Sequence, residues 1–237
     1  MLTKSFMPWS CCVSDIAPMK NPAEIAVEQV SRLYTRHEHL ADAIVHVLGI
    51  LFAINASLWL LFHVTGLPVV VSVTIYCAGL LAMIGFSAAY NLVPHHRPSK
   101  QVLRRLDHAA IFIMIAGTYT PFAVNRLGDS GTAILVIIWC AATFGVIMKV
   151  LFPRRFEMAS LALYLGMGWT IVTVISPLAH TMAAFDFWLL IAGGFVYSAG
   201  VVFYVWERIP YHKAIWHGAV LAAAVLQFSS IALEFVN

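Results

Sequence analysis

The sequence predicts an all-α integral membrane protein, a bundle of seven transmembrane helices with its N-terminus in the cytoplasm and its C-terminus outside. Hydrophobic residues make up 61% of the 237 residues and charged residues only 11%, a balance outside the range of soluble domains. Charge-free stretches of about bilayer length recur along the chain. Every Lys and Arg except Arg126 falls before the first stretch or in alternate connections, as the positive-inside rule predicts.

The charge-free stretches and the turn signals between them give the seven helices. The longest stretch, between Asp42 and Arg97, has room for two spans, and Gly66 and Pro68 indicate a turn within it. We expect helices over 40–62, 68–91, 107–125, 131–152, 157–178, 184–206 and 213–236. Asp107 would then open the third helix. Small residues should let helices approach closely, and they occur at 116–117, 166–168, 193–194 and 199–200.

The first 38 residues are expected to form a cytoplasmic tail, followed by a membrane domain over 39–237. The tail lacks the continuous apolar core of a signal peptide, so we expect no cleavage. Asn21, Pro22 and Glu24 are typical of a helix start. A short helix on the membrane surface and a partly ordered polar tail are the two alternatives for this segment.

The charge distribution indicates the membrane and the partners. The formal net charge is +3, and the basic residues sit where they would contact anionic lipid headgroups. We therefore expect membrane lipids as partners and no nucleic acid. A bacterial cytoplasmic membrane is the expected location.

Polar residues gather at the predicted cytoplasmic ends of the helices. Ser87 and Asn91 lie one turn apart, as do Lys213 and His217. Ionisable groups at membrane depth are costly and by default indicate function. Each has a plainer explanation: Asp107 favours a helix N-terminus, Lys213 can reach the headgroups, and a histidine can be a core residue. The whole set is His46, Ser87, Asn91, Asp107, Lys213 and His217.

Several motifs resemble the hemolysin III proteins, the bacterial branch of the progestin and adipoQ receptor superfamily. The resemblance runs from about His39 onward. It rests on five segments, 87–91, 106–111, 115–122, 209–211 and 214–218, which read SAAYN, LDHAAI, IAGTYTPF, IPY and AIWHG. It implies a seven-helix bundle with a zinc site near the cytoplasmic face. It also implies ceramidase-like hydrolysis in the adiponectin-receptor branch.

This sequence departs from the ligand pattern that the resemblance implies. The family holds zinc with a histidine one turn after the Ser87 position and with two histidines one turn apart on the last helix, and the Asp107 position holds a bound water. Here Asn91 and Lys213 replace two of the histidines, and neither is a good zinc ligand. Only His217 and Asp107 keep ligand chemistry. We therefore expect a degenerate site without zinc and no other cofactor.

Other residues offer alternatives for this site. His212 precedes Lys213, but one residue along a helix turns a side chain by about 100°. His46, His95 and His96 are further imidazoles that a rebuilt zinc site would use. Without zinc, the ammonium group of Lys213 is expected to replace the missing cation and pair with Asp107.

Three function classes follow. The preferred one is a non-catalytic protein that binds a lipid or steroid-like ligand, or affects the state of the membrane, through a cavity on the cytoplasmic side. The second is a zinc-dependent lipid amide hydrolase with a rebuilt metal site, in which Asp107 and Ser87 would act in catalysis. The third is a pore-forming hemolysin. The outer halves of the helices contain few polar groups to line an ion path, which disfavours a pore.

Overall fold

The structure, a computed structural model, describes residues 35–94, 96–152 and 155–236. The described chain is helical apart from short connections and one isolated bridge between Val64 and Val236. The described residues from His37 onward belong to one compact unit. The predicted surface helix, most of the predicted tail and His95 lie outside the described residues. The all-α class and the total of seven long helical segments are confirmed, whereas the orientation in the membrane stays a prediction.

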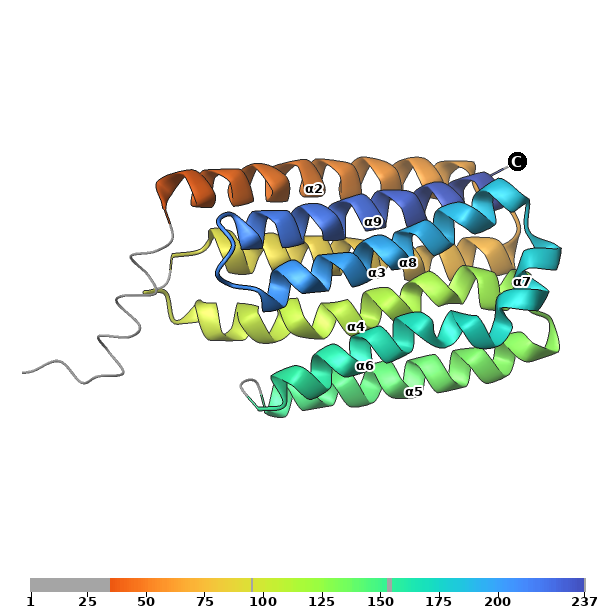
Figure 1. Cartoon of the computed structure of the whole chain (residues 1–237). Helices are drawn as coiled ribbons and strands as arrows, with labels where there is room; N and C mark the ends of the chain where they lie inside the picture. The colour runs from red at the N-terminus through yellow and green to blue at the C-terminus, as the bar shows by residue number, and fades with distance from the viewer. Residues whose placement is uncertain (1–34, 95, 153–154, 237) are drawn as a thin grey trace, which may run out of the picture. The chain divides into compact units, whose positions relative to one another are not determined.

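Seven helical segments follow one another along the described chain, and the fifth segment is broken into three parts (Figure 1). In chain order they are α2 (Arg36–His63), α3 (Leu67–Leu92), α4 (Ser99–Asn125), α5 (Asp129–Leu151), α6 (Glu157–Trp169) with η1 (Thr170–Val174) and α7 (Ile175–Thr181), α8 (Ala184–Val205), and α9 (His212–Phe235).

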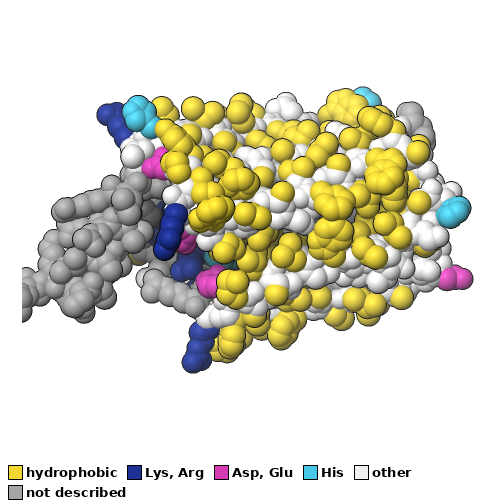
Figure 2. All heavy atoms as spheres, in the orientation of Figure 1, with side chains coloured by type: hydrophobic (Ala, Val, Ile, Leu, Met, Phe, Trp, Pro, Cys, Tyr) yellow, Lys and Arg dark blue, Asp and Glu magenta, His cyan; other side chains and the backbone are white. Residues whose placement is uncertain are grey.

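Six of the segments are long and apolar enough to cross a membrane, namely α2, α3, α5, Glu157–Thr181, α8 and α9. The remaining long segment, α4, lies among them in the bundle (Figure 1). Apolar side chains cover the middle of the face seen in Figure 2, and the Lys and Arg side chains in that view gather at one end. This is the distribution expected of a bundle surrounded by hydrocarbon.

The first turns of α4 correct one prediction. The third helix was expected to begin at Asp107, but α4 begins at Ser99, so Asp107 lies about two turns inside the helix. The basic sequence before Asp107 forms helix because Lys100 bridges to α3. Its Nζ donates to the carbonyl oxygens of Tyr90 and of Val93, the latter at 2.8 Å. The dipole at a helix N-terminus therefore does not explain a carboxylate at position 107.

The fifth segment was predicted as one continuous helix over 157–178, and it is instead interrupted by the 3₁₀ turn η1. Pro177 has no N–H to donate to the carbonyl four residues earlier. Before the break, the carbonyl groups of Met167 and Gly168 accept hydrogen bonds from the hydroxyl group of Tyr119 at 2.9 and 2.8 Å. A neighbouring helix thus satisfies the backbone groups that the interruption frees.

Small residues bring helices together at some of the predicted positions only. A Cβ atom on Gly117 of α4 would lie 3.3 Å from the backbone oxygen of Ile75 on α3, so these two backbones are in close contact. Gly193 and Gly200 of α8 lie against side chains of α9 in the same way. Gly166 and Gly168, in contrast, face open space. The prediction that these two glycines pack against another helix is wrong.

Arg126, the one basic residue predicted on the outer side, lies where α4 ends. Its guanidinium group forms an ion pair with the carboxylate of Glu234 and donates to the Glu234 carbonyl oxygen at 3.2 Å. It also lies 5.4 Å from the centre of the Phe235 ring. Arg126, the exception to the charge pattern, therefore joins the end of α4 to the end of α9.

Candidate functional site

A cavity of about 660 Å³ runs through the bundle. Residues of every long helical segment except α5 line it. On α9 the lining extends from His212 to Gln227, a distance of about 22 Å at 1.5 Å per residue. The cavity is therefore long and narrow, and it follows the direction of the helices.

Seven of the residues predicted for the site line this cavity, at one end of it, whereas His96, named for a rebuilt zinc site, is exposed and lies outside the lining. The seven come from four different helices and are His46, Ser87, Asn91, Asp107, His212, Lys213 and His217. The rest of the lining is mostly apolar, with Met83, Ile111, Met114, Phe122 and Leu190 among its members. The cavity thus combines one polar end with a long apolar part.

Three buried polar residues of α2 point toward the start of α9. Glu38, Asp42 and His46 follow one another at intervals of one turn, and all three are buried. The Glu38 carboxylate accepts a hydrogen bond of 2.9 Å from the backbone N–H of Tyr211. Tyr211 adopts a left-handed conformation, with φ of 60°, directly before α9. Glu38 therefore fixes the place where the last helix begins.

Asp42 connects two histidines of the cavity wall. Its Oδ1 lies 2.6 Å from Nδ1 of His217, and its Oδ2 lies 3.6 Å from Nε2 of His46. The two imidazole rings are 4.5 Å apart, centre to centre. The Nε2 atom of His46 is buried and has no hydrogen-bond partner among the described residues. Asp42 is absent from the cavity lining, so without a metal it acts on the cavity by orienting the two rings.

Asp42, His46 and His217 form the group of described residues that has the chemistry and spacing of a metal site. One ligand atom from each lies within 4.8 Å of the others. Sequence reasoning named His217 and, as an accessory residue, His46, but it overlooked Asp42 and Glu38. The sequence contains a signal for them, because Glu38, Asp42 and His46 follow one another at intervals of one helical turn. The spacing alone does not show that these three side chains face α9.

The positions expected to hold the family ligands are arranged differently. Asn91 donates its side-chain N–H to the backbone oxygen of Ser87 at 2.9 Å, so its amide is engaged on its own helix. His212 is the first residue of α9. Its side chain is therefore turned by about 100° from that of Lys213, as expected for neighbours on one helix. Asp107 and Lys213 both line the cavity, and their pairing stays a prediction.

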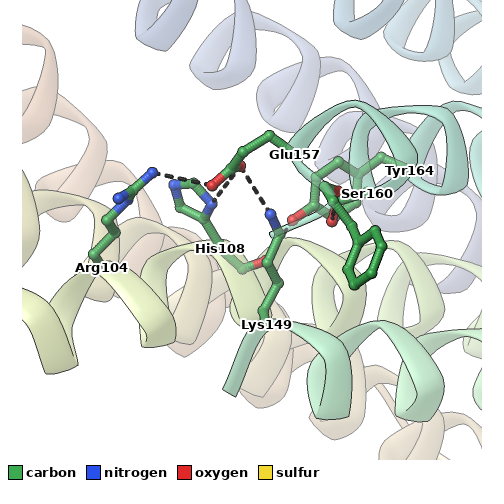
Figure 3. Close-up of polar contacts among 7 residues, drawn as sticks. Arg104, His108, Lys149, Glu157, Ser160 and Tyr164 are labelled. Atoms are coloured by element: carbon green, nitrogen blue, oxygen red, sulfur yellow. Dashed lines mark hydrogen bonds and ion pairs between the residues drawn. The ribbon is translucent and has the colours of Figure 1, made fainter. Parts of the chain in front are cut away.

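A second polar cluster joins α4, α5 and α6 beside the same end of the cavity (Figure 3). Its centre is the Glu157 carboxylate, which accepts from Arg104 at 3.0 Å and from the nearly fully buried Lys149 at 2.9 Å. Nδ1 of His108 lies 3.7 Å from the same carboxylate. The hydroxyl group of Tyr164 donates to the backbone oxygen of His108 at 2.7 Å. Glu157 therefore holds the first turn of α6 against two other helices.

Comparison with known proteins identifies the family. Residues 34–228 match the family described as "Haemolysin-III related". The chain is 37% identical over 200 residues to "Hemolysin-3 homolog" of Bacillus subtilis (strain 168), covering 83% of this chain and 93% of the relative. It is 39% identical over 195 residues to "Hemolysin-3" of Bacillus cereus, covering 81% and 89%.

A similarity to animal proteins supports the wider grouping that the sequence motifs indicated. The chain is 29% identical over 203 residues to "Monocyte to macrophage differentiation factor" of Homo sapiens, covering 83% of this chain and 84% of the relative. The seven-helix fold and the motifs at the polar end of the cavity agree with these matches. The chain therefore belongs to the hemolysin III family of the progestin and adipoQ receptor superfamily.

Proposed function

We propose that this protein binds a membrane lipid in the cavity, with the lipid's polar head at the end that holds Asp107, Lys213 and His217 and its chain along the apolar part. The observation that supports this most is the separation of the lining into one polar end and a long apolar part. A volume of about 660 Å³ is in the range of small-molecule binding sites.

The polar end would determine which lipid binds. Moving an acyl chain from the bilayer into an apolar cavity gains little, because the surrounding lipid is as apolar as the cavity wall. Affinity and selectivity must then come from contacts with the head. The polar end offers cationic groups on Arg104 and Lys213, carboxylates on Asp107 and Glu157, and several imidazoles. Such a mixed set suits a head that carries hydrogen-bonding groups as well as charge.

The location and orientation belong to the same proposal. We place the bundle in the cytoplasmic membrane with its polar end at the cytoplasmic face. The basic residues Arg97, Lys100, Arg104 and Arg105 follow α3 and open α4, on the side where cationic connections are retained. The bound head would then lie in the inner leaflet of the membrane.

Filling the cavity tests the proposal. Gly194 lines the cavity, and a Cβ atom there would meet nothing within 4 Å, so Gly194→Phe should place a ring in the cavity without moving the backbone. Gly85 on α3 has the same open surroundings but is exposed and lies outside the lining, which makes Gly85→Phe the matched control. We expect native mass spectrometry to find bound lipid on the wild-type protein and on Gly85→Phe. Equal retention by Gly194→Phe would contradict binding in the cavity.

A second candidate function, that of a zinc-dependent lipid amide hydrolase, is favoured by one observation. Nε2 of His46 is buried without a hydrogen-bond partner among the described residues, and it lies beside an aspartate and a second histidine. Two imidazoles and a carboxylate are a ligand set that catalytic zinc uses, so Asp42, His46 and His217 fit the metal. When bound, zinc would activate a water molecule for attack on an amide carbonyl. Asp107 and Ser87, which line the same cavity, would be the catalytic residues in this case.

Metal analysis of the purified protein decides this candidate. If it is correct, the protein carries stoichiometric zinc that His46→Ala removes. His63→Ala is the matched control because His63 is exposed at the end of α2 and bonds only its own helix, with Nδ1 2.7 Å from the Trp59 oxygen. Zinc-free wild-type protein purified without chelator would exclude the hydrolase, and it would leave lipid binding as the function.

A further inference from the structure

The apolar part of the cavity contains an amide group. Gln227 on α9 lines the cavity ten residues beyond His217, which places it roughly 15 Å farther along the helix. Its stem lies against Gly193 of α8, where a Cβ atom would be only 2.8 Å from Cγ of Gln227. Any larger residue at position 193 would therefore displace the Gln227 side chain.

The other polar side chains in this part of the lining already have protein partners. The hydroxyl group of Thr118 donates to the Met114 oxygen at 2.9 Å, and Tyr119 donates to Met167 and Gly168. Ser198 donates to the Gly194 oxygen at 2.9 Å and accepts from Trp169. No hydrogen bond, by contrast, joins the Gln227 side chain to another described residue.

An unpaired amide at this depth is unfavourable. Water is scarce in the hydrocarbon part of a membrane, so an unpaired amide there costs free energy that a leucine would not. Polar residues at membrane depth generally face a cavity and contact a ligand or an ion path. The cavity offers no ion path at this level because most of its lining is apolar. A ligand group is the partner that remains.

We propose that Gln227 is a second recognition point that binds a hydroxyl or carbonyl group on the chain of the lipid. The ligand class is then an elongated amphiphile with its head at the polar end and a second hydrogen-bonding group roughly 15 Å away. This inference rests on the proposed lipid binding and adds the position of one functional group to it. An amide both donates and accepts, so it pairs with either group, whereas a plain hydrocarbon chain leaves it unpaired.

Lipid probes that differ in one hydroxyl group test the assignment. Three single-chain probes are compared on delipidated full-length protein in detergent: unsubstituted octadecanoic acid, the same acid with a hydroxyl about two thirds of the way along the chain, where it reaches roughly the 15 Å that separate His217 and Gln227 along the helix, and the same acid with a hydroxyl beside the carboxyl group. We expect the distant hydroxyl to tighten binding by roughly threefold to tenfold, the worth of one net hydrogen bond. The hydroxyl beside the head should give no such gain.

Two variants connect the preference to the residue. Gln227→Leu keeps the stem that packs on Gly193 and removes the amide, so it should abolish the preference and bind the unsubstituted acid at least as well as the wild type does. Gln101→Leu makes the same change at an exposed position of α4 outside the lining and should keep the preference. Gln227→Leu should not lower the Tm of the ligand-free protein, because the amide has no hydrogen-bond partner among the described residues to lose.

The outcomes separate this inference from the proposed function. Equal binding of all three acids by the wild type would overturn the role of Gln227 and leave lipid binding intact. A preference that survives in Gln227→Leu, or a lowered Tm in that variant, would also overturn it. Absence of binding of any probe to the wild type would overturn both proposals together.

Discussion

Asp42 connects two histidines at the polar end of the cavity. It bonds His217 at 2.6 Å and lies 3.6 Å from Nε2 of His46, one turn away from Glu38. Because Asp42 is buried and lies behind the cavity wall, its effect on a ligand passes through the two imidazoles. A carboxylate in this position fixes which ring nitrogen of His217 carries the proton.

Removing this carboxylate should destabilise the protein. Asp42→Ala leaves Nδ1 of the half-buried His217 without its partner, so we expect the free energy of unfolding to fall by about 1–3 kcal/mol. Asp129→Ala is the matched control, because Asp129 is an exposed acid in the first turn of α5 and should cost at most about 1 kcal/mol. Chemical unfolding in detergent micelles measures both. Equal losses for the two variants would show that the Asp42–His217 bond contributes little.

At the scale of single residues, the sequence predicts which groups belong to the polar end better than it predicts their partners. Seven predicted residues line the cavity, because helix ends carrying polar residues meet at one end of a bundle, and the predicted His96 does not. The interactions depend on how the helices are rotated. Asn91 bonds Ser87 on its own helix, and His217 bonds Asp42 on α2. Neither contact can be read from spacing along one helix.

At the scale of elements, α6 is the part of the cavity wall that depends most on polar contacts. Its first turn is held by Glu157, and its last turn ends where Tyr119 binds the carbonyl groups of Met167 and Gly168. Between these ends, Gly166 faces open space. The segment is thus attached at its two ends, by a charge cluster and by one tyrosine, and between them by the hydroxyl group of Tyr164, which donates to the backbone oxygen of His108.

Loss of the Glu157 charge should therefore loosen α6. In Glu157→Gln the buried ammonium group of Lys149 loses its counter-charge, and we expect a loss of roughly 1–3 kcal/mol in the free energy of unfolding. The double variant Glu157→Gln with Lys149→Met should recover most of that loss, because no charge then remains buried without a partner. A double variant no more stable than Glu157→Gln would count against a charge effect.

Close packing between α4 and α5 gives another prediction at this scale. A Cβ atom on Gly145 would overlap the ring of Phe112, which is fully buried. Gly145→Ala should therefore destabilise the protein by about 1–3 kcal/mol. The same change at Gly85, which has open surroundings, should be neutral or stabilising by up to about 1 kcal/mol. Thermal unfolding of the two variants compares them directly, and a tolerated Gly145→Ala would contradict the packing described.

The helices themselves were predictable because membrane helices need long stretches without charge. That criterion failed at α4, whose first turns carry Lys100, Arg104 and Arg105 and therefore resemble a loop. It also failed at η1, because a charge-free stretch gives no sign of a break. Pro177 is a signal in the segment itself, whereas the hydrogen bonds from Tyr119 to the Met167 and Gly168 oxygens are contacts with another helix, which the sequence of one segment does not show.

At the scale of the whole molecule, the cavity exists only because several helices pack together. Six helical segments contribute to its lining, so neither its volume nor its apolar character follows from one motif. The apolar part of the cavity also argues against the third predicted function, that of a pore-forming hemolysin. An ion crossing the bundle would lose its hydration without polar groups to replace it.

Purified protein in liposomes should accordingly cause no leakage. We expect an entrapped dye and entrapped potassium to remain inside vesicles at low protein density, for the wild type and for the cavity-filling Gly194→Phe alike. Leakage that rises with the wild type and is lost in Gly194→Phe would indicate that the cavity conducts. The lining would then have to rearrange from the structure described here.

Photocrosslinking with a single-chain lipid that carries a photoreactive group in the middle of its chain tests the central claim most directly. Lipid binding in the cavity predicts adducts on residues of the apolar lining such as Ile111, Met114 and Leu190, competed by unlabelled lipid and absent in Gly194→Phe. Adducts confined to outward-facing residues such as Leu81 and Val136, which are 40% and 58% exposed, would contradict the claim, because the lipid would then contact only the outside of the bundle.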